Sequence, residues 1–500
     1  MKLKVTGDIN QYYVQTLCMI FFPGEKFSDK ACETEDGEIA TPELSLELVE
    51  KEDGVVARAE LALDGKYSSV EKVYALREDI THDRLKKIAV GDAILSVCGD
   101  IMGYRPSWGM LVGVRPSKVA TEMLESGMSK TRVKRTLSSD YFVIPKKAAL
   151  ATEVALNEAE LVKKADPKEC SVYISIPFCP TRCAYCSFVS YTSKKLLATI
   201  PDYLVALGDE IKKTFKLIGE LGLRVKTVYI GGGTPTTLDA VQLEWLLSLI
   251  DESYDVSTVD EYTLEAGRPD TIDKEKMDIA VKHGVTRISV NPQTLNDDVL
   301  RIIGRAHNAE DFLRAYDIVR NSGVRTINTD MIAGLPGDKF ASFASSYDRV
   351  VVLRPENITV HTFSVKKASD ILKSSTHIYS VRGGDVGKCV DYSQITAQHE
   401  GYQPYYMYRQ KNTVGNYENV GFALEGHKGL YNIYMMEEIH SIFACGAGAV
   451  SKFVDYNPAN GEKRVIERFF NPKYPYEYLS DNKTEAKLES AREFYLRRGL

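Results

Sequence analysis

The sequence predicts an α/β protein whose central part is a partial TIM-like (β/α)6 barrel. Short apolar runs alternate with amphipathic stretches from residue 171 to about residue 364, while the regions before and after follow other patterns. The chain has 500 residues, which is enough for two to four domains. We therefore expect an N-terminal α+β domain (1–166), the barrel (167–365) and a C-terminal mixed α/β extension (366–500).

The N-terminal region mixes strands and helices. Residues 44–50 and 56–63 alternate apolar and polar side chains on either side of Asp53-Gly54, which predicts a β-hairpin with a tight turn. Residues 148–164 have the spacing and the composition of a helix. Residues 165–168 then fit a linker to the barrel.

The barrel strands are predicted from apolar runs. They are residues 172–176, 227–230, 261–265, 287–290, 326–331 and 358–363. In parallel barrels the chemistry gathers at the carboxyl ends of the strands. The residues that follow each run are therefore the candidates for a functional site.

Composition narrows the class of protein. The chain has 63 basic and 69 acidic residues and therefore a net charge of −6. This overall charge does not indicate the basic surface that binding of nucleic acid requires. We find neither a signal-peptide pattern nor an apolar stretch long enough to span a membrane. Six of the nine cysteines are scattered, so a disulfide framework is not indicated, and we expect a cytoplasmic protein.

Three clustered cysteines follow the first barrel strand. Cys179, Cys183 and Cys186 are separated by three and then two residues, so one loop can place three thiolates around a soft metal centre. Three thiolates without a nearby fourth describe a [4Fe–4S] cluster with one open iron, which S-adenosylmethionine can bind. The alternatives are a zinc site completed by a distant histidine and a loop of unrelated thiols.

A glycine-rich loop follows the second strand. Residues 231–236 read Gly-Gly-Gly-Thr-Pro-Thr, and bare backbone with free N–H groups can bind a carboxylate. A tight strand-to-helix turn is the alternative. Together with the cysteine loop, this loop fits the methionine end of S-adenosylmethionine.

Polar side chains follow the next three strands. Glu265 would hold an ammonium group at the barrel mouth, unless it is a solvated surface residue. Gln293 and Arg305 could converge on ribose or carboxylate oxygens, whereas Arg305 and His307 alone would more often be surface residues. Asp330 lies in an apolar run and needs a partner, either a ribose hydroxyl or a backbone turn.

Taken together, these motifs resemble the radical SAM superfamily. The set Ile-Pro-Phe-Cys-x3-Cys-x-Tyr-Cys-x-Phe, Gly-Gly-Gly-Thr-Pro-Thr, Gly-Arg-Ala-His and Asp-Met-Ile-Ala-Gly-Leu-Pro-Gly is similar, more narrowly, to the oxygen-independent coproporphyrinogen III oxidase group of HemN-like proteins. Glu-Ala-Gly-Arg-Pro-Asp at 265–270, the run 360–369 and the segment 108–118 resemble its HemZ branch.

The resemblance implies a radical SAM barrel and assigns roles to individual residues. The implied cluster ligands are Cys179, Cys183 and Cys186. The positions implied to contact cluster-bound S-adenosylmethionine are Tyr173, Gly232, Gly233, Thr234 and Glu265. The positions implied to surround the nucleoside, or a second S-adenosylmethionine, are Tyr185, Gln293, Arg305 and Asp330.

The implied activity is oxidative decarboxylation of two propionates of coproporphyrinogen III to vinyl groups, giving protoporphyrinogen IX in haem biosynthesis. The implied partners are a porphyrinogen or haem substrate and a small electron donor such as flavodoxin or ferredoxin. Substrate propionates need cations. The candidates, each of which would alone more often be a solvated surface residue, are Arg268, Lys366, Lys367, Arg409 and Lys411.

One position departs from the motif of the oxidases, which is similar to Cys-x3-Cys-x2-Cys-x-Cys. Phe188 stands in this chain at the position of the last cysteine. Cys-x-Phe resembles the haem chaperone branch and the haem-degrading radical methyltransferases. Both therefore stay open as alternatives, whereas a tRNA-modifying enzyme is disfavoured by the acidic balance. A haem-delivery protein would need an axial ligand, for which the candidates are His361, His377, His427 and His440.

Overall fold

The computed structural model describes residues 1–23, 25–28, 41–186, 191–364, 384–410, 413–455, 464–481 and 483–499. The chain forms two compact units. The first unit consists of Met1–Leu156, Thr376–Gly387 and Met407–Glu418. The second unit consists of Asn157–Ser375, Lys388–Tyr406 and Asn419–Leu500. Nothing in this arrangement tests the three predicted domains, and they stay a prediction.

The first unit is built on a four-stranded sheet in the order β1-β2-β3-β4. Its elements are β1 (Lys2–Thr6), α1 (Gln11–Phe21), β2 (Glu43–Lys51), β3 (Gly54–Leu63), β4 (Lys66–Ala75), α2 (His82–Met102), α3 (Ser117–Glu125), α4 (Lys130–Ser139) and most of α5 (Pro145–Lys163). The predicted hairpin is confirmed, since β2 and β3 pair antiparallel with Lys51 opposite Gly54. The predicted helix is α5.

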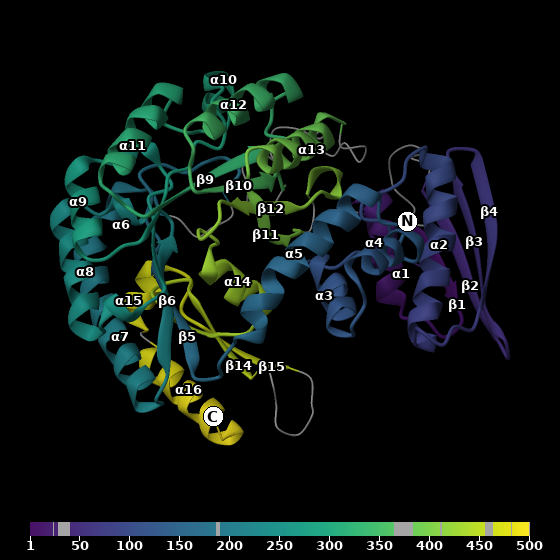
Figure 1. The fold of residues 1–500 in the computed structure, drawn as a ribbon, viewed down its shortest axis with the longest axis horizontal. Coiled ribbons are helices and arrows are strands. Elements are labelled where there is room, and N and C mark those ends of the chain that lie inside the picture. Colours follow the sequence, from purple (N-terminus) through teal and green to yellow (C-terminus); the bar gives the residue numbers. More distant parts are fainter. Residues whose placement is uncertain are drawn as a thin grey trace. The chain divides into compact units, whose positions relative to one another are not determined.

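Helix α2 lies along this sheet (Figure 1). The Thr81 side chain caps its start by accepting a hydrogen bond from the Arg84 amide at 3.3 Å. Gly103, with φ at 70°, ends it in the left-handed conformation that glycine adopts without strain. The buried face of α2, which includes Leu85, Ile88 and Ile94, supplies much of the core of the first unit.

The second unit is organised around one long sheet in the order β11-β12-β10-β9-β8-β7-β6-β5-β13-β14-β15. Its central strands are β5 (Glu169–Ile176), β6 (Arg224–Gly232), β7 (Glu261–Glu265), β8 (Arg287–Ser289), β9 (Thr326–Ala333) and β10 (Asn357–Thr362). These six strands are parallel, which confirms the predicted β/α units. The outer strands are β11 (Gln403–Tyr408), β12 (Asn419–Ala423), β13 (Ser441–Cys445), β14 (Val450–Asp455) and β15 (Val465–Phe470).

Helices connect the parallel strands and form an arc outside them (Figure 1). They are α6 (Lys194–Leu197), α7 (Ile200–Glu220), α8 (Ala240–Ser253), α9 (Lys274–Lys282), α10 (Asp297–Ile302), α11 (Ala309–Asn321) and α12 (Phe340–Val352). The remaining helices are α13 (Gly384–His399), α14 (Leu430–Glu437), α15 (Pro475–Ser480) and α16 (Thr484–Arg498). Among the described residues, no helix has the length and apolar character needed to cross a membrane.

The C-terminal region continues the barrel sheet at both of its edges. Strand β13 pairs parallel with β5, and β12 pairs antiparallel with β10. A buried polar network then ties α16 to α7. The carboxylate of Glu210 accepts hydrogen bonds from Lys487 Nζ at 2.5 Å, Tyr478 at 2.6 Å and Asn471 at 2.9 Å. Burial opposes ionisation of Glu210, but the charge of Lys487 holds its pKa below the usual value.

We expect Lys487→Met to lower the free energy of unfolding by about 3–5 kcal/mol, because it leaves the buried Glu210 carboxylate without its cation. Denaturant unfolding followed by circular dichroism measures this loss. Lys483→Met is the matched control, since Lys483 is half exposed and pairs weakly with Asp481 at 3.6 Å. Equal losses in the two variants would contradict the role given to the network.

Candidate active site

The structure brings the residues predicted for a functional site to the carboxyl ends of the parallel strands. Tyr173 lies in β5, Gly232 ends β6 and Glu265 ends β7. Gln293 follows β8, and Asp330 lies in β9. In a parallel sheet these ends share one edge, so these residues lie toward the same edge of the barrel sheet.

The cysteine loop begins directly after β5. The amide of Cys179 donates to the Tyr191 carbonyl at 3.1 Å, and the amide of Cys186 donates to the Cys183 carbonyl at 3.0 Å. The Ala184 amide donates to the carbonyl of Ile303, beyond α10, at 2.9 Å. Both ends of the loop are therefore held by backbone hydrogen bonds, and its last two cysteines share one turn.

The three thiols lie in one electrostatic neighbourhood. Burial raises the pKa of Cys179 to about 11, Thr234 and Arg268 oppose the rise, and Cys183 and Cys186 add to it. Cys179 Sγ lies 3.3 Å from Thr234 Oγ1. Within the described ranges, no three His, Cys, Asp or Glu side chains have the arrangement of a metal site. The thiols are thus neighbours on one loop, a donor set that fits a three-thiolate cluster once they converge.

The glycine-rich loop holds the cysteine loop. The Gly233 amide donates to the Ile176 carbonyl and the Thr234 amide to the Phe178 carbonyl, both at 2.8 Å. A Cβ atom on Gly233 would lie 2.5 Å from the Phe178 carbonyl oxygen, so glycine is required for this close approach. The expectation that the N–H groups of this loop are free for a ligand carboxylate is not met at Gly233 and Thr234, whose amides are bonded to backbone carbonyls, while the Gly232 amide donates to the Glu265 carboxylate.

Glu265 is a half-buried acid without a cation among the described residues. Its carboxylate accepts hydrogen bonds from the Tyr229 hydroxyl and from the Gly232 amide. Burial raises its pKa to about 7, with the charge of Asp330 adding to the rise. In the part of the chain that the structure describes, no Lys, Arg or His side chain forms an ion pair with it. The site therefore suits a ligand that brings a positive charge, such as an ammonium group.

Three stacked tyrosines lie beside this acid. The Tyr173 ring lies 6.0 Å from Tyr229 and 6.3 Å from Tyr431, and the Tyr229 and Tyr431 rings are 4.6 Å apart. Burial and the charge of Glu265 raise the pKa of all three hydroxyls. Tyr431 begins α14, far along the sequence, and no local motif marks it.

Tyr185 and Arg305 bind each other. The Arg305 guanidinium donates to the Tyr185 hydroxyl at 3.1 and 3.3 Å and to the Gly267 carbonyl at 3.0 Å. Its three nitrogens are thus engaged by the protein. Arg305 consequently positions the cysteine loop through Tyr185, rather than presenting an empty fork to a ligand.

Asp330 is held by two asparagines. Asn291 Nδ2 and Asn328 Nδ2 each donate to its carboxylate at 2.9 Å, and His361 Nε2 lies 3.7 Å away. Burial alone would raise the pKa of Asp330, but the hydrogen bond and charge of His361 bring it below the usual value. Its partners are therefore side chains of the barrel, and Asn291 is a site residue that the sequence reasoning missed.

Next to this group, the Gln293 side chain retains an unused acceptor. Gln293 has a positive φ of 66° and pairs by backbone hydrogen bonds with Asp330 and Ile332. Its Oε1 atom is buried and, among the described residues, has no hydrogen-bond partner. A donor on a bound ligand would satisfy it.

Arg268 and His307 differ from their expected surface settings. Arg268 is buried, pairs with Asp270 at 2.9 and 3.0 Å, and donates to the Thr181 carbonyl at 2.9 Å. Its Nη1 atom lies 3.9 Å from Cys183 Sγ. His307 is 4% exposed, and burial, with the charge of Arg305, lowers its pKa to about 4. Arg268 therefore braces the cysteine loop.

The other candidates lie elsewhere. Phe188, Lys366, Lys367, His377 and Lys411 fall outside the described residues. Arg409 belongs to the first unit. His427 bonds Thr326 at 2.8 Å and His440 bonds Ser171 at 3.1 Å, both near the amino ends of parallel strands. Of the three candidate histidines that the structure describes, His361 is the one that lies beside the site.

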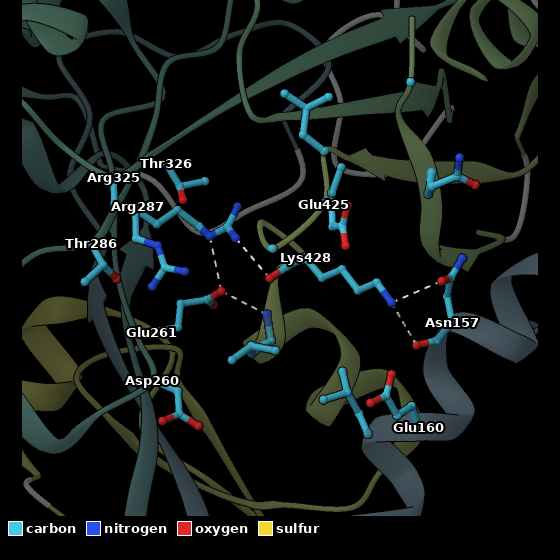
Figure 2. A pocket seen from close by; sticks show the side chains of 17 residues that line it. Asn157, Glu160, Asp260, Glu261, Thr286, Arg287, Arg325, Thr326, Glu425 and Lys428 are labelled. Atoms are coloured by element: carbon cyan, nitrogen blue, oxygen red, sulfur yellow. Dashed lines mark hydrogen bonds and ion pairs between the residues drawn. The ribbon is translucent and has the colours of Figure 1, made fainter. Parts of the chain in front are cut away.

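A cavity of about 610 Å³ opens near the amino ends of β7, β8 and β9, away from these residues. Figure 2 shows Arg287 and Glu261 facing each other in it, 3.2 Å apart. Arg287 also donates to the Lys428 carbonyl at 3.1 Å, and Glu261 accepts from the Leu430 amide at 2.8 Å. Its buried charges thus satisfy each other, and the chemistry expected of the barrel lies at the opposite ends of the strands.

Comparison with known proteins agrees with this geometry. Residues 173–350 match the sequence profile described as Radical SAM superfamily. The chain is 39% identical over 382 residues to the oxygen-independent coproporphyrinogen-III oxidase-like protein HemZ of Bacillus subtilis (strain 168), covering 75% of each chain. It is 29% identical over 327 residues to the heme chaperone HemW of the same organism, covering 64% of this chain and 81% of that protein.

Among solved structures, the coproporphyrinogen III oxidase HemN of Escherichia coli, described as a radical SAM enzyme, aligns with a TM-score of 0.48 at 20% identity. The alignment covers 67% of this chain and 73% of that chain.

The parallel barrel with a three-cysteine loop at its carboxyl edge, together with the profile match, defines a radical SAM protein. Superfamily membership implies a [4Fe–4S] cluster and S-adenosylmethionine. Within this superfamily, the chain belongs to the HemZ branch of the oxygen-independent coproporphyrinogen III oxidase-like family.

We expect Glu265→Gln to change the pH dependence of stability. The pKa of Glu265 is raised from 4.5 to about 7, so the folded protein binds more protons than the unfolded chain between these values. The free energy of unfolding should therefore fall across this window as pH rises, by at most about 3 kcal/mol. Glu265→Gln should remove this contribution, which melting temperatures at pH 5 and pH 8 measure. Glu275→Gln, at an exposed position, is the control, and parallel profiles for Glu265→Gln and the wild type would refute the assignment.

We expect Arg268→Gln to weaken retention of a reconstituted cluster by about 10–100-fold in affinity, because the cysteine loop loses its brace at Thr181. Iron and sulfide retained per chain after anaerobic reconstitution and competition with a chelator measure this. Arg224→Gln, which removes an exposed arginine from the same unit, is the control. Unchanged retention in Arg268→Gln would show that the brace is dispensable.

Proposed function

We propose that this protein is a radical SAM coproporphyrinogen III dehydrogenase, an oxygen-independent oxidase that forms protoporphyrinogen IX in haem biosynthesis. The observation that carries the proposal is the 39% identity, over three quarters of the chain, to a protein named oxygen-independent coproporphyrinogen-III oxidase-like. The half-buried Glu265 at the carboxyl end of β7 supports it, because an acid without a cation among the described residues suits a cationic cofactor.

In this proposal Cys179, Cys183 and Cys186 bind the cluster, and Glu265 accepts the ammonium group of S-adenosylmethionine. Tyr173, Gly232, Gly233 and Thr234 line the same end of the cofactor. The nucleoside, or a second S-adenosylmethionine, lies against Tyr185, Gln293, Arg305 and Asp330. Gln293 Oε1 is suited to accept a hydrogen bond from the ligand, since it has no partner among the described residues.

When bound, the reduced cluster and S-adenosylmethionine supply a 5′-deoxyadenosyl radical. This radical would abstract a β-hydrogen atom from each propionate; release of CO2 and transfer of one electron to a separate electron acceptor would then leave a vinyl group. A small electron-donor protein such as flavodoxin or ferredoxin supplies the reducing electron. The chain's contribution is to hold the acids and thiols in partly buried positions, where their interactions with charged ligands are stronger than in water.

We expect anaerobic incubation with coproporphyrinogen III, S-adenosylmethionine and dithionite to yield protoporphyrinogen IX and 5′-deoxyadenosine. Changing Cys179, Cys183 and Cys186 together to Ser should abolish both products, because the cluster loses its ligands. Cys98→Ala, in α2 of the first unit, is the control and should retain activity. Chromatography of the oxidised porphyrins measures the outcome. Formation of 5′-deoxyadenosine with intact coproporphyrinogen would contradict the substrate assignment.

A haem-delivery protein is the second candidate. The similarity to a heme chaperone HemW favours it, as does His361, whose ring lies beside Asp330 at the carboxyl ends of the strands. A Soret shift on adding haem, followed by transfer of haem to an apo-acceptor, would support this function. A third candidate is a radical methyltransferase that opens the haem ring, for which label from the S-adenosylmethionine methyl group must appear in the product.

A further inference from the structure

An unpaired arginine lies buried in the first unit. Arg409, directly after β11, is 4% exposed, and its amide donates to the Val114 carbonyl at 2.7 Å. Its Nε and Nη1 atoms are buried and have no hydrogen-bond partner within the described parts of the chain. A guanidinium buried in this way is rare, because each unmet donor costs free energy.

The neighbouring acid does not provide the missing partner. Glu418 accepts a hydrogen bond from Lys147 Nζ at 2.6 Å and another from Trp108 Nε1 at 2.7 Å. The side chains of Lys147 and Glu418 are fully buried, and each balances the charge of the other. Among the described residues, Glu418 thus already has the Lys147 cation as its ion-pair partner.

The surroundings of Arg409 disfavour its positive charge. Burial lowers its pKa to about 10, and the charge of Glu418 offsets the fall in part. The segment that binds the Arg409 amide also lines a cavity of about 740 Å³ in the same unit, through Val112, Gly113 and Val114. The backbone of Arg409 is therefore bonded to a segment that lines this cavity, and Arg409 itself is not one of the lining residues.

We propose that Arg409, near the Lys147–Glu418 pair, forms a carboxylate-binding site in the first unit. A carboxylate supplies the missing negative charge, and its two oxygens match the planar N–H donors of a guanidinium. If the proposed function holds, on which this assignment rests, the group is a propionate of the tetrapyrrole. A small dicarboxylate presents the same chemistry, so the source must be tested separately.

The first measurement uses the full chain without ligand. Arg409→Met removes an uncompensated buried charge and should leave the melting temperature unchanged or raise it. A structural arginine would instead give a lower melting temperature in both Arg409→Met and Arg409→Lys, and this would overturn the proposal. Arg58→Gln, at an exposed position of the first unit, is the control.

The second measurement is binding of coproporphyrin III, followed by fluorescence quenching. We expect the wild type and Arg58→Gln to bind the free acid equally, and Arg409→Met to bind it at least about 10-fold more weakly, as loss of a charged hydrogen bond predicts. The tetramethyl ester, which has no carboxylates, should bind Arg409→Met and the wild type alike. Equal binding of the free acid by the wild type and Arg409→Met would overturn the site while leaving the proposed function intact.

A third measurement separates the two sources of the carboxylate. If the wild type binds no tetrapyrrole, but succinate raises its melting temperature and not that of Arg409→Met, the site stands and the proposed function fails. If neither coproporphyrin nor succinate distinguishes the two proteins, or if phosphate alone does, the carboxylate site is wrong.

Discussion

Two backbone hydrogen bonds between neighbouring loops underlie the whole candidate site. The Gly233 amide donates to the Ile176 carbonyl, and the Thr234 amide donates to the Phe178 carbonyl. These two bonds join the glycine-rich loop after β6 to the start of the cysteine loop after β5. The approach is so close that a side chain on Gly233 would collide with the Phe178 carbonyl. The first cysteine and the acid at the end of β7 therefore take their positions from the same piece of backbone.

The arginines and the acids at the carboxyl ends of the barrel strands have different kinds of partners. Arg268 and Arg305 are used internally, and both donate to carbonyls or hydroxyls around the cysteine loop. The two acids have opposite settings, since Asp330 is held by asparagines and His361 whereas Glu265 has no cation among the described residues. This difference explains why the pKa of Asp330 falls and the pKa of Glu265 rises. It also leaves Glu265 as the group best suited to meet a charged ligand.

The central fold could be predicted from sequence because each parallel strand is a continuous apolar run. The positions of β13 and β12 in the sheet could not be predicted. Ser441 of β13 pairs with Cys170 of β5, which lies far away in the sequence, and no local sequence signal indicates that pairing. The cysteines and Glu265 could be found from strand ends and spacing. The use of the Gly233 amide, and the role of Asn291, depend on tertiary contacts that a single sequence does not display.

We propose that S-adenosylmethionine binds at a cluster held by the cysteine loop, with its ammonium group beside Glu265. Electron–nuclear double resonance of the reconstituted, reduced protein with amino-15N-labelled S-adenosylmethionine tests this most directly. We expect a resolved 15N coupling to the cluster that disappears when Cys179, Cys183 and Cys186 are changed together. A cluster signal from the wild type that shows no 15N coupling at saturating S-adenosylmethionine would contradict it.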